Sequence, residues 1–299
     1  MTKTNGRGRW DGMQILSVTL LLISCVLILL PFLLMLFSSL TDENTLLVNG
    51  YTFFPAKWSL SAYEYIFKSS GMILKSYGYS ILVTIIGTVI SLFLTCTMAY
   101  PLSRPYFRYR RIFSFFVFFT MLFNGGLISQ YMLWTTVFKI KNTIFAYIVP
   151  NLLMSGFYVL IVRNYFAGSI PLEVVESAKI DGCGEWYAFF KIVLPMAKPI
   201  LAAIGILTAL TYWNDWTNGL YYITKTEMYT FQNLLNRMIQ QINFLSSGQA
   251  SQVAKAVGKV PSVSVRMGIA VIGVLPVLIM YPFFQKYFAS GLTVGAVKG

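Results

Sequence analysis

The sequence has little charge and no histidine. Only 11% of its 299 residues are charged, none is His and three are Cys. Ordinary soluble domains carry roughly a quarter charged residues, so this chain has too few to cover a water-exposed globule. Histidine is the usual general base and the commonest metal ligand. Its absence excludes a Ser-His-Asp triad and leaves metal clusters short of ligands.

The cysteines do not indicate a disulfide framework. Cys25 and Cys96 lie inside apolar runs, and Cys183 lies in a segment that we expect in the cytoplasm. Disulfides are rare in reducing compartments. No structural disulfide is therefore expected.

The chain also lacks the phosphate-binding loop of ATPases. No Gly-x-x-x-x-Gly-Lys-Ser/Thr string occurs, and Gly258-Lys259 has Val253 where the first glycine belongs. That loop supplies the backbone cradle for nucleotide phosphates. We therefore expect no catalytic residue, no metal and no cofactor on this chain.

Apolar residues, in contrast, make up 57% of the sequence. A hydrocarbon core of about 30 Å needs about 20 apolar residues in a helix. Six stretches meet that length: 13–38, 76–100, 112–134, 143–164, 197–216 and 265–285. The predicted fold class is all-α, a polytopic membrane protein with six transmembrane helices. The first apolar run is too long for a cleavable signal peptide and should remain as an anchor.

The net charge of +13 has two interpretations. A basic patch is typical of nucleic-acid binding, but the cations are scattered between apolar runs, which favours a lipid bilayer and no nucleic acid. Cations in short loops are retained on the cytoplasmic side. The densest group lies in one short turn and comprises Arg104, Arg108, Arg110 and Arg111. This group predicts that both termini lie in the cytoplasm.

Several spans contain helix-weakening residues: Gly87, Gly156, Gly205, Gly268, Gly273 and Pro276. Small residues allow helices in membranes to pack closely, which is the simpler interpretation. Alternatively, Gly273 and Pro276 let the last helix bend during a transport cycle, because proline kinks are tolerated where neighbours satisfy the freed backbone.

The segment between the fourth and fifth spans has the signals of a short helix. Pro171 suits a first helical turn, Glu173 and Glu176 complement the positive helix end, and Gly182 can adopt a left-handed cap. These signals predict a helix of about ten residues, too short to span a membrane. An ordinary surface helix closed by a glycine would show the same signals. The spacing of the whole motif is therefore needed to distinguish such a helix from a functional one.

The motif reads Glu176-Ser177-Ala178, then Gly182, then Ile192-x-Leu194-Pro195. This order resembles the EAA loop of the permease subunits of binding-protein-dependent ABC importers, with Ser177 where the family usually has alanine. The resemblance implies the type I permease fold, with the coupling loop over 171–199. It divides the chain into a peripheral helix and outer loop over 1–75, a permease core over 76–290, and a cytoplasmic tail over 291–299.

In that family the loop docks on an ATPase, which the resemblance assigns to Glu176, Ser177, Ala178, Asp181 and Gly182. Asp181 either pairs with Lys179 or caps the turn. The implied partners are a second permease subunit, generally a non-identical relative, two cytosolic ATPase subunits that use ATP and Mg, and an extracellular or periplasmic solute-binding protein. The implied location is the bacterial plasma (inner) membrane.

Other segments resemble the carbohydrate-uptake branch of this family. They are Met121-Leu-Phe-Asn-Gly-Gly-Leu-Ile, Asn142-Thr143, Pro150 and Tyr212-Trp213-Asn214-Asp215. The branch implies import of an oligosaccharide, including acidic ones such as alginate. Another solute class remains an alternative, as does an ion-coupled secondary transporter, although the latter expects ionisable residues at mid-membrane. A membrane enzyme lacks the necessary residues, and a non-transporting scaffold would not need a polar cavity.

The candidate substrate path combines aromatic rings, which stack on sugars, with amides and a carboxylate, which bind hydroxyls. Its members are Tyr212, Trp213, Asn214, Asp215, Trp216, Asn124 and Asn151. An interfacial aromatic belt explains the aromatic residues equally well. Asp215 favours a path, because ionisable residues in membranes usually face a cavity or a partner.

The long outer loop over 217–263 contains apolar residues with helical spacing: Phe231, Leu234, Leu235, Met238, Ile239 and Ile242. The opposite face carries Asn233, Asn236, Arg237, Gln240 and Asn243. This helix either packs the loop onto the outer surface or meets the solute-binding protein.

Overall fold

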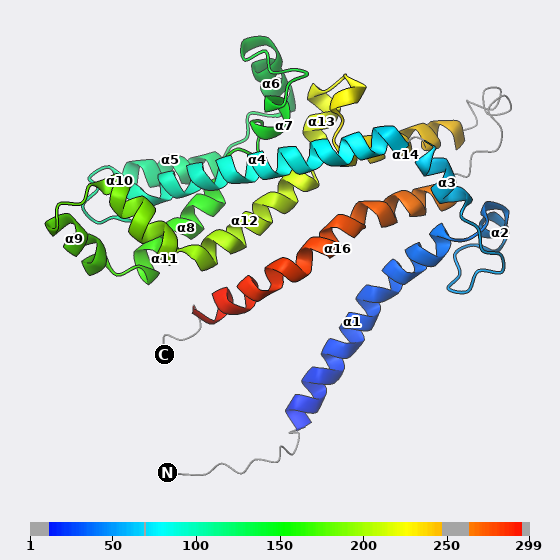
Figure 1. The fold of residues 1–299 in the computed structure, drawn as a ribbon, viewed down its shortest axis with the longest axis horizontal. Coiled ribbons are helices and arrows are strands. Elements are labelled where there is room, and N and C mark those ends of the chain that lie inside the picture. Colours follow the sequence, from blue (N-terminus) through cyan, green and yellow to red (C-terminus); the bar gives the residue numbers. More distant parts are fainter. Residues whose placement is uncertain (1–11, 69, 247–262, 295–299) are drawn as a thin grey trace. The chain divides into compact units, whose positions relative to one another are not determined.

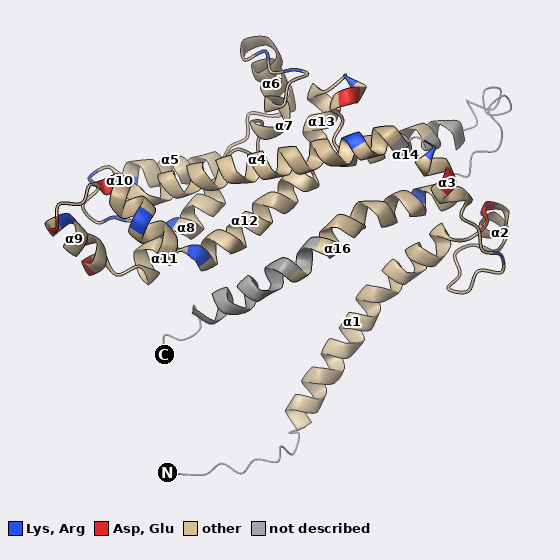
Figure 2. Cartoon of the chain, in the orientation of Figure 1, with Lys and Arg blue, Asp and Glu red and all other residues tan. Residues whose placement is uncertain are grey.

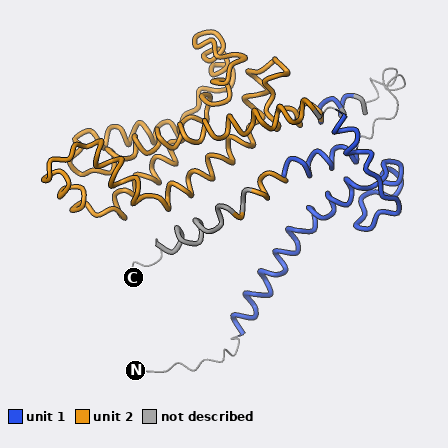
Figure 3. Tube along the Cα trace, in the orientation of Figure 1, with its two compact units in different colours: residues 1–69, 239–274 blue, residues 70–238, 275–299 orange. Residues whose placement is uncertain are grey.

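The computed structural model describes residues 12–68, 70–246 and 263–294, in which the regular elements are helices joined by turns and loops, with one isolated bridge between Thr41 and Trp58. Two compact units divide the chain (Figure 3). Unit 1 comprises residues 1–69 and 239–274, and unit 2 comprises residues 70–238 and 275–299. Gly258-Lys259 and the end of the predicted tail lie outside the described residues.

Unit 1 contains α1 (Gly12–Ser39), α2 (Glu43–Asn49), α3 (Ser61–Phe67) and the beginning of α16 (Val263–Val294). The most apolar window of α1 has a mean hydropathy of 3.1 and none of it is buried, as expected of a helix whose surroundings are lipid. Glu43 accepts hydrogen bonds from the amides of Val263 (3.0 Å) and Ser264 (2.9 Å). A carboxylate at this position stabilises the positive end of α16.

Unit 2 is organised around the long helix α4 (Ser70–Ser103), along which α8 (Gly156–Ser169) and α12 (Lys198–Trp213) pack (Figure 1). The core between these helices is apolar and close-packed, as membrane helices with small residues allow. Its fully buried members include Ala99, Val159, Val162, Phe166 and Ala197.

The remaining elements of unit 2 are shorter. In chain order they are α5 (Arg110–Leu122), α6 (Leu127–Met132), η1 (Leu133–Val137), α7 (Phe145–Ile148), α9 (Leu172–Ile180), α10 (Glu185–Tyr187), η2 (Ala188–Val193), α11 (Leu194–Met196), α13 (Thr217–Tyr222), η3 (Thr226–Met228) and α14 (Phe231–Ser246), which continues into unit 1.

The predicted spans fall on helices, but two of them are not continuous. The expectations over 13–38 and 76–100 are confirmed by α1 and α4, the two described helices that are long and apolar enough to cross a membrane unbroken. The span over 112–134 breaks after α5 and bends by 111°. The span over 143–164 is interrupted at Asn151, whose φ is 62°. One continuous helix in either place was therefore a wrong expectation.

Local residues explain both breaks. Asn124-Gly125-Gly126 follows α5, and Gly126 has a φ of 80°, a conformation that glycine adopts without strain. Pro150 lacks the amide needed to continue α7. A second bent pair joins residues 185–196 to 198–222 at 82°, which gives up to four spans if each pair crosses once. The count of six spans stays a prediction, as does the orientation of the termini.

The helix predicted in the outer loop is confirmed as α14. Its apolar face is buried at Phe231, Leu234 and Leu235. Asn233 was placed on the polar face but is fully buried, because its amide lies against the hydroxyl of Tyr147 (3.4 Å) and its oxygen accepts a bond from Arg237 (3.2 Å). Tertiary packing, which a helical wheel does not contain, buries this asparagine.

The glycines of the spans lie where helices approach closely. A Cβ on Gly87 would lie 2.6 Å from the Tyr212 ring, and one on Gly156 would lie 2.9 Å from the carbonyl of Val117. These distances support the packing interpretation. Bending at Gly273 and Pro276 remains a hypothesis.

We predict that Gly87→Ala destabilises the protein by about 2 kcal/mol, because the added methyl group overpacks the α4–α12 contact. The readout is the midpoint of thermal unfolding in detergent. Gly78→Ala is the matched control, since Gly78 lies on the same helix and its Cβ would meet nothing within 4 Å. An equal loss in both variants would contradict the packing argument.

Candidate functional site

The predicted short helix is present as α9, nine residues over Leu172–Ile180, with Pro171 before its first turn. Gly182 has a φ of 83°. The Gly182 amide donates to the Lys179 carbonyl (3.0 Å) and the Cys183 amide donates to the Ala178 carbonyl (2.9 Å). This pair of bonds is a Schellman motif, which satisfies the last carbonyls of the helix. The helix and its left-handed glycine cap are confirmed.

One buried residue fixes α9 to the bundle. Val175 is fully buried in the core cluster with Phe189 and Val193 of η2. The π-helical turn η2 precedes Pro195, which cannot donate a backbone hydrogen bond, and such turns often replace regular helix near proline. The apolar contact therefore holds the short helix rigidly against the chain segment that leads into α12.

A charged contact closes the turn after α9. Lys179 forms an ion pair with Glu185, and Tyr100 donates a hydrogen bond to the same carboxylate (2.9 Å). The ammonium of Lys179 also lies 3.8 Å from the centroid of the Tyr106 ring. Of the two predicted roles for Asp181, the structure shows the cap: Asp181 ends α9, and Lys179 pairs with Glu185 instead. Sequence reasoning missed Glu185, because the pair forms across a glycine turn rather than along a helix.

This contact changes two pKa values in opposite directions. Burial alone would raise the pKa of Glu185, but the hydrogen bonds from Lys179 and Tyr100 outweigh it and lower that pKa below its ordinary value. Burial alone would lower the pKa of Lys179, but the bonds to Glu185 and Tyr106 outweigh it and raise that pKa. The stabilisation from Glu185 is therefore lost only as the pH falls through its lowered pKa, and both groups stay charged at neutral pH.

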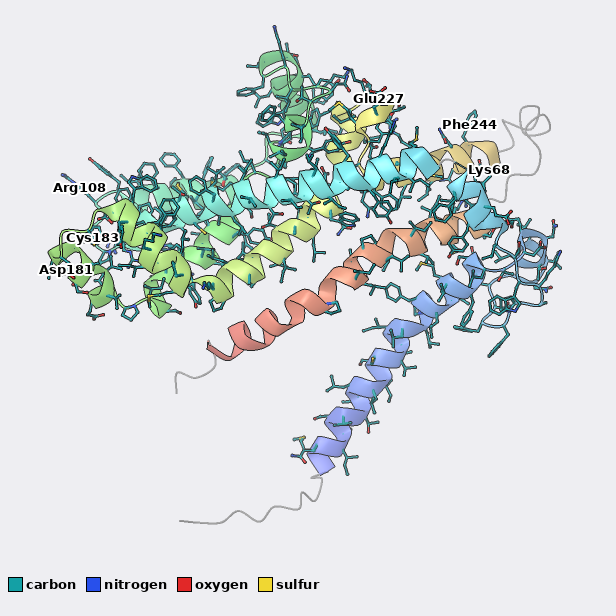
Figure 4. All side chains as sticks on the ribbon, in the orientation of Figure 1. Lys68, Arg108, Asp181, Cys183, Glu227 and Phe244 are labelled. Atoms are coloured by element: carbon teal, nitrogen blue, oxygen red, sulfur yellow. The ribbon has the colours of Figure 1, made fainter. Side chains whose placement is uncertain are left out.

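The outer surface of α9 and its turn is largely exposed. Glu176, Ser177, Asp181 and Gly182 are exposed, whereas Ala178 is half-buried. Apolar side chains are exposed beside them: Ile180 is 86% exposed and Trp186 is 63% exposed. Figure 4 labels Asp181 and Cys183 at the protruding end of this turn. A surface that combines a carboxylate with large exposed apolar groups has the features of a protein docking site.

The aromatic part of the candidate substrate path is buried. Tyr212 is 3% exposed and its hydroxyl donates to the Ile148 carbonyl (2.9 Å). Trp213 is 4% exposed and its ring lies 6.1 Å from that of Tyr77. In this conformation both rings pack helices together and present no open face to a sugar.

The polar residues that follow divide between two roles. Asp215 accepts hydrogen bonds from the amides of Thr217 and Asn218, both at 3.1 Å, and so caps α13. Asn214 and Trp216 are exposed. Residues 212–216 therefore form the junction between α12 and α13. Among these five candidates, Asn214 and Trp216 are exposed to a solute.

The two remaining candidates meet at a residue that sequence reasoning missed. Gln130 donates from its amide nitrogen to the Asn124 oxygen (3.1 Å) and accepts on its own oxygen from the Asn151 amide (3.0 Å). Asn124 and Asn151 are exposed, and both lie at the helix breaks described above. An array of three amides at interruptions of apolar helices is a polar surface suited to hydroxyl groups. The bend after α5, which brings Gln130 to both asparagines, is invisible in a hydropathy profile.

Asn142 has a structural role. Its φ is 58°, its side-chain oxygen accepts from the amides of Thr224 (2.7 Å) and Lys225 (3.2 Å), and its nitrogen donates to the Thr224 hydroxyl (2.9 Å). The residue therefore fastens two distant loops together. This explains the presence of an asparagine there without a solute.

The fold and the site define a class: a helical, multi-pass membrane protein that presents a short, glycine-capped helix outside its bundle. The sequence profile of the family described as binding-protein-dependent transport system inner membrane component matches residues 88–294. The chain belongs to this family and is a permease subunit of an ABC importer in the inner membrane. It is not itself catalytic. Membership implies an ATPase and a solute-binding protein as partners, and it excludes the ion-coupled alternative.

Two relatives and one solved structure align with almost the whole chain. Protein LplC of Bacillus subtilis is 36% identical over 91% of this chain and 90% of its own length. The polygalacturonan/rhamnogalacturonan transport system permease protein YtcP of Bacillus subtilis is 37% identical over 93% of this chain and 96% of its own. A crystal structure of a bacterial ABC transporter involved in the import of the acidic polysaccharide alginate matches with a TM-score of 0.78 and 29% identity, over 95% of this chain and 100% of that chain.

Proposed function

We propose that this chain imports an oligosaccharide, and specifically an acidic one derived from a plant or algal polysaccharide. The observation that carries the proposal is that the permease of a polygalacturonan/rhamnogalacturonan transport system and a transporter involved in alginate import both align over more than nine-tenths of the chain. The exposed amide array around Gln130 is consistent with a hydroxyl-rich cargo. In this proposal the chain pairs with a second, related permease subunit.

The proposed coupling element is α9 with its turn. Closure of two ATPase subunits around ATP and Mg would move the exposed surface of Glu176, Ser177, Ala178, Asp181 and Gly182. Val175 and the Lys179–Glu185 pair would transmit that movement to the bundle, because they fix the turn to η2 and α4. The cavity between the two permease subunits would then change from inward-open to outward-open.

The proposed topology places α9 and the arginines near α5 in the cytoplasm together with both termini. It retains six crossings, with the bent pair of α5 and α6 counted as one and the interrupted segment of α7 and α8 counted as another. The proposed divisions remain a peripheral helix and outer loop over 1–75, a permease core over 76–290 and a tail over 291–299. Cysteine accessibility at residues on either side tests this arrangement.

The cargo is tested by uptake of labelled oligogalacturonides in a strain that lacks the chromosomal gene. Restoring the gene is expected to restore uptake, and an uncharged oligosaccharide of equal length should compete weakly. Equal competition would limit the proposal to oligosaccharides in general. Restored growth on a non-carbohydrate solute alone would contradict it.

The substrate path is tested at Gln130. We predict that Gln130→Ala lowers kcat/KM for uptake about tenfold, because each lost hydrogen bond to a bound hydroxyl costs about 1 kcal/mol and the two asparagines lose their positions. Gln241→Ala is the matched control, since Gln241 is an exposed glutamine on α14 that lies outside both the amide array and the candidate substrate path. Equal uptake by the Gln130 variant and the wild type would remove the array from the path.

A further inference from the structure

A basic hollow lies between α5 and α8 in unit 2. Its volume is about 510 Å³. Three arginines line it, together with one hydroxyl and an apolar flank; its lining residues are Arg110, Arg111, Arg163, Ser114, Phe115, Phe118 and Leu160. No carboxylate is among them. In Figure 2, blue segments gather at the end of unit 2 that holds α9 and α10.

Only some of the polar groups of the hollow have partners among the described residues. The Ser114 hydroxyl is buried and has no hydrogen-bond partner there. Arg163 donates from Nε to the Leu102 carbonyl (3.3 Å), which fixes the guanidinium at the wall. Neither Arg110 nor Arg111 forms an ion pair with a described carboxylate. A concave site with three cations, a buried unpartnered hydroxyl and no counter-ion favours an anion, because an anion would pair with the guanidinium groups and satisfy the hydroxyl.

The surroundings of the hollow identify the kind of anion. Beyond the arginines, α5 exposes a row of large apolar side chains along its length: Ile112, Phe115, Phe116 and Phe119. The positive charge of Arg110 and Arg111 therefore lies at the beginning of α5, and the exposed apolar surface lies along the rest of the helix. Basic pockets between membrane helices at the cytoplasmic face bind lipid head groups in this way. A phospholipid suits both features, because its head group is anionic and its acyl chains are apolar.

We propose that this hollow binds the phosphodiester head group of an anionic phospholipid. The phosphate lies between Arg110, Arg111 and Arg163 and accepts a hydrogen bond from Ser114, and the acyl chains run along the aromatic side chains of α5. The site is separate from the amide array and from α9. The inference rests on the proposed cytoplasmic position of this turn, but it does not depend on which solute is imported.

The test measures the lipid that the full-length protein retains from mixed phosphatidylglycerol and phosphatidylcholine nanodiscs after detergent extraction. The wild type is expected to be enriched in phosphatidylglycerol. In the double variant Arg110→Gln/Arg111→Gln the enrichment should fall about fivefold for each charge removed. The control is Arg108→Gln/Lys191→Gln, which removes the same charge at two exposed cations outside the hollow; Figure 4 labels Arg108.

The remaining outcomes separate the alternatives. Equal loss in both double variants would mean general attraction to a charged surface and would overturn the site. Displacement of the lipid by inorganic phosphate at millimolar concentration would assign the hollow to a free anion. If the Arg110/Arg111 variant kept its lipid but lost a second permease subunit during purification, the hollow would be a subunit contact, and the lipid proposal would be wrong. Uptake of the sugar is not a readout here, so failure of the cargo proposal is distinguishable.

Discussion

Gly182→Val is expected to abolish uptake while the subunit remains in the membrane. Gly182 has a φ of 83° and closes α9 through the two Schellman hydrogen bonds. A left-handed conformation costs an L-residue about 1–2 kcal/mol and is least accessible to a β-branched side chain. The turn would open, and the surface proposed to dock on the ATPase would lose its shape. The measurements are sugar uptake and subunit abundance in membranes.

Two further variants separate backbone strain from the size of the side chain. A Cβ on Gly182 would meet nothing within 4 Å in this chain, so any clash must come from a partner. Gly182→Asn adds bulk but tolerates the left-handed region, whereas Gly182→Ala is small but strained. If backbone geometry matters, the asparagine variant should retain more uptake than the alanine variant. If both work normally and the valine variant also transports, the coupling assignment is wrong.

The short helix could be predicted because its signals are local. Pro171, Glu173 and Gly182 each act on the backbone within a few residues, and the resulting α9 begins and ends where these residues place it. The helix α14 was predictable for the same reason, since its apolar spacing persists over several turns. The family resemblance added what spacing alone does not give, namely the kind of partner on which the helix is proposed to dock.

The breaks in the spans could not be predicted from hydropathy. Residues 112–134 and 143–164 are apolar enough to cross a membrane, and a composition window does not detect a bend of 111° or a left-handed residue at Asn151. For the same reason, hydropathy could not predict that Asn124, Gln130 and Asn151 lie together or that Tyr212 is buried. The Gln130–Asn151 bond and the burial of Tyr212 depend on contacts between residues that are far apart in the chain.

Glu176→Lys is expected to remove the ATPase from the purified complex. The Glu176 side chain is exposed and forms no hydrogen bond or ion pair with the described residues, so its charge is available to a partner. A surface change of this kind normally alters stability by no more than about 0.5 kcal/mol. Reversing one charge of a close interfacial pair costs several kcal/mol, which corresponds to at least about a hundredfold loss of affinity. Mass spectrometry of the complex isolated from native membranes measures the recovery of the ATPase.

Glu173→Lys is the matched control for this experiment. Both residues are exposed glutamates on α9, so the change in net charge is identical. Glu173 lies in the first turn of the helix, where a carboxylate stabilises the positive helix end by about 0.3–1 kcal/mol. If helix stability held the ATPase, Glu173→Lys would be the more damaging variant, and if total charge held it, the two variants would be equally damaging. If Glu176 contacts the ATPase directly, the order reverses, and only that order is consistent with α9 as the coupling element.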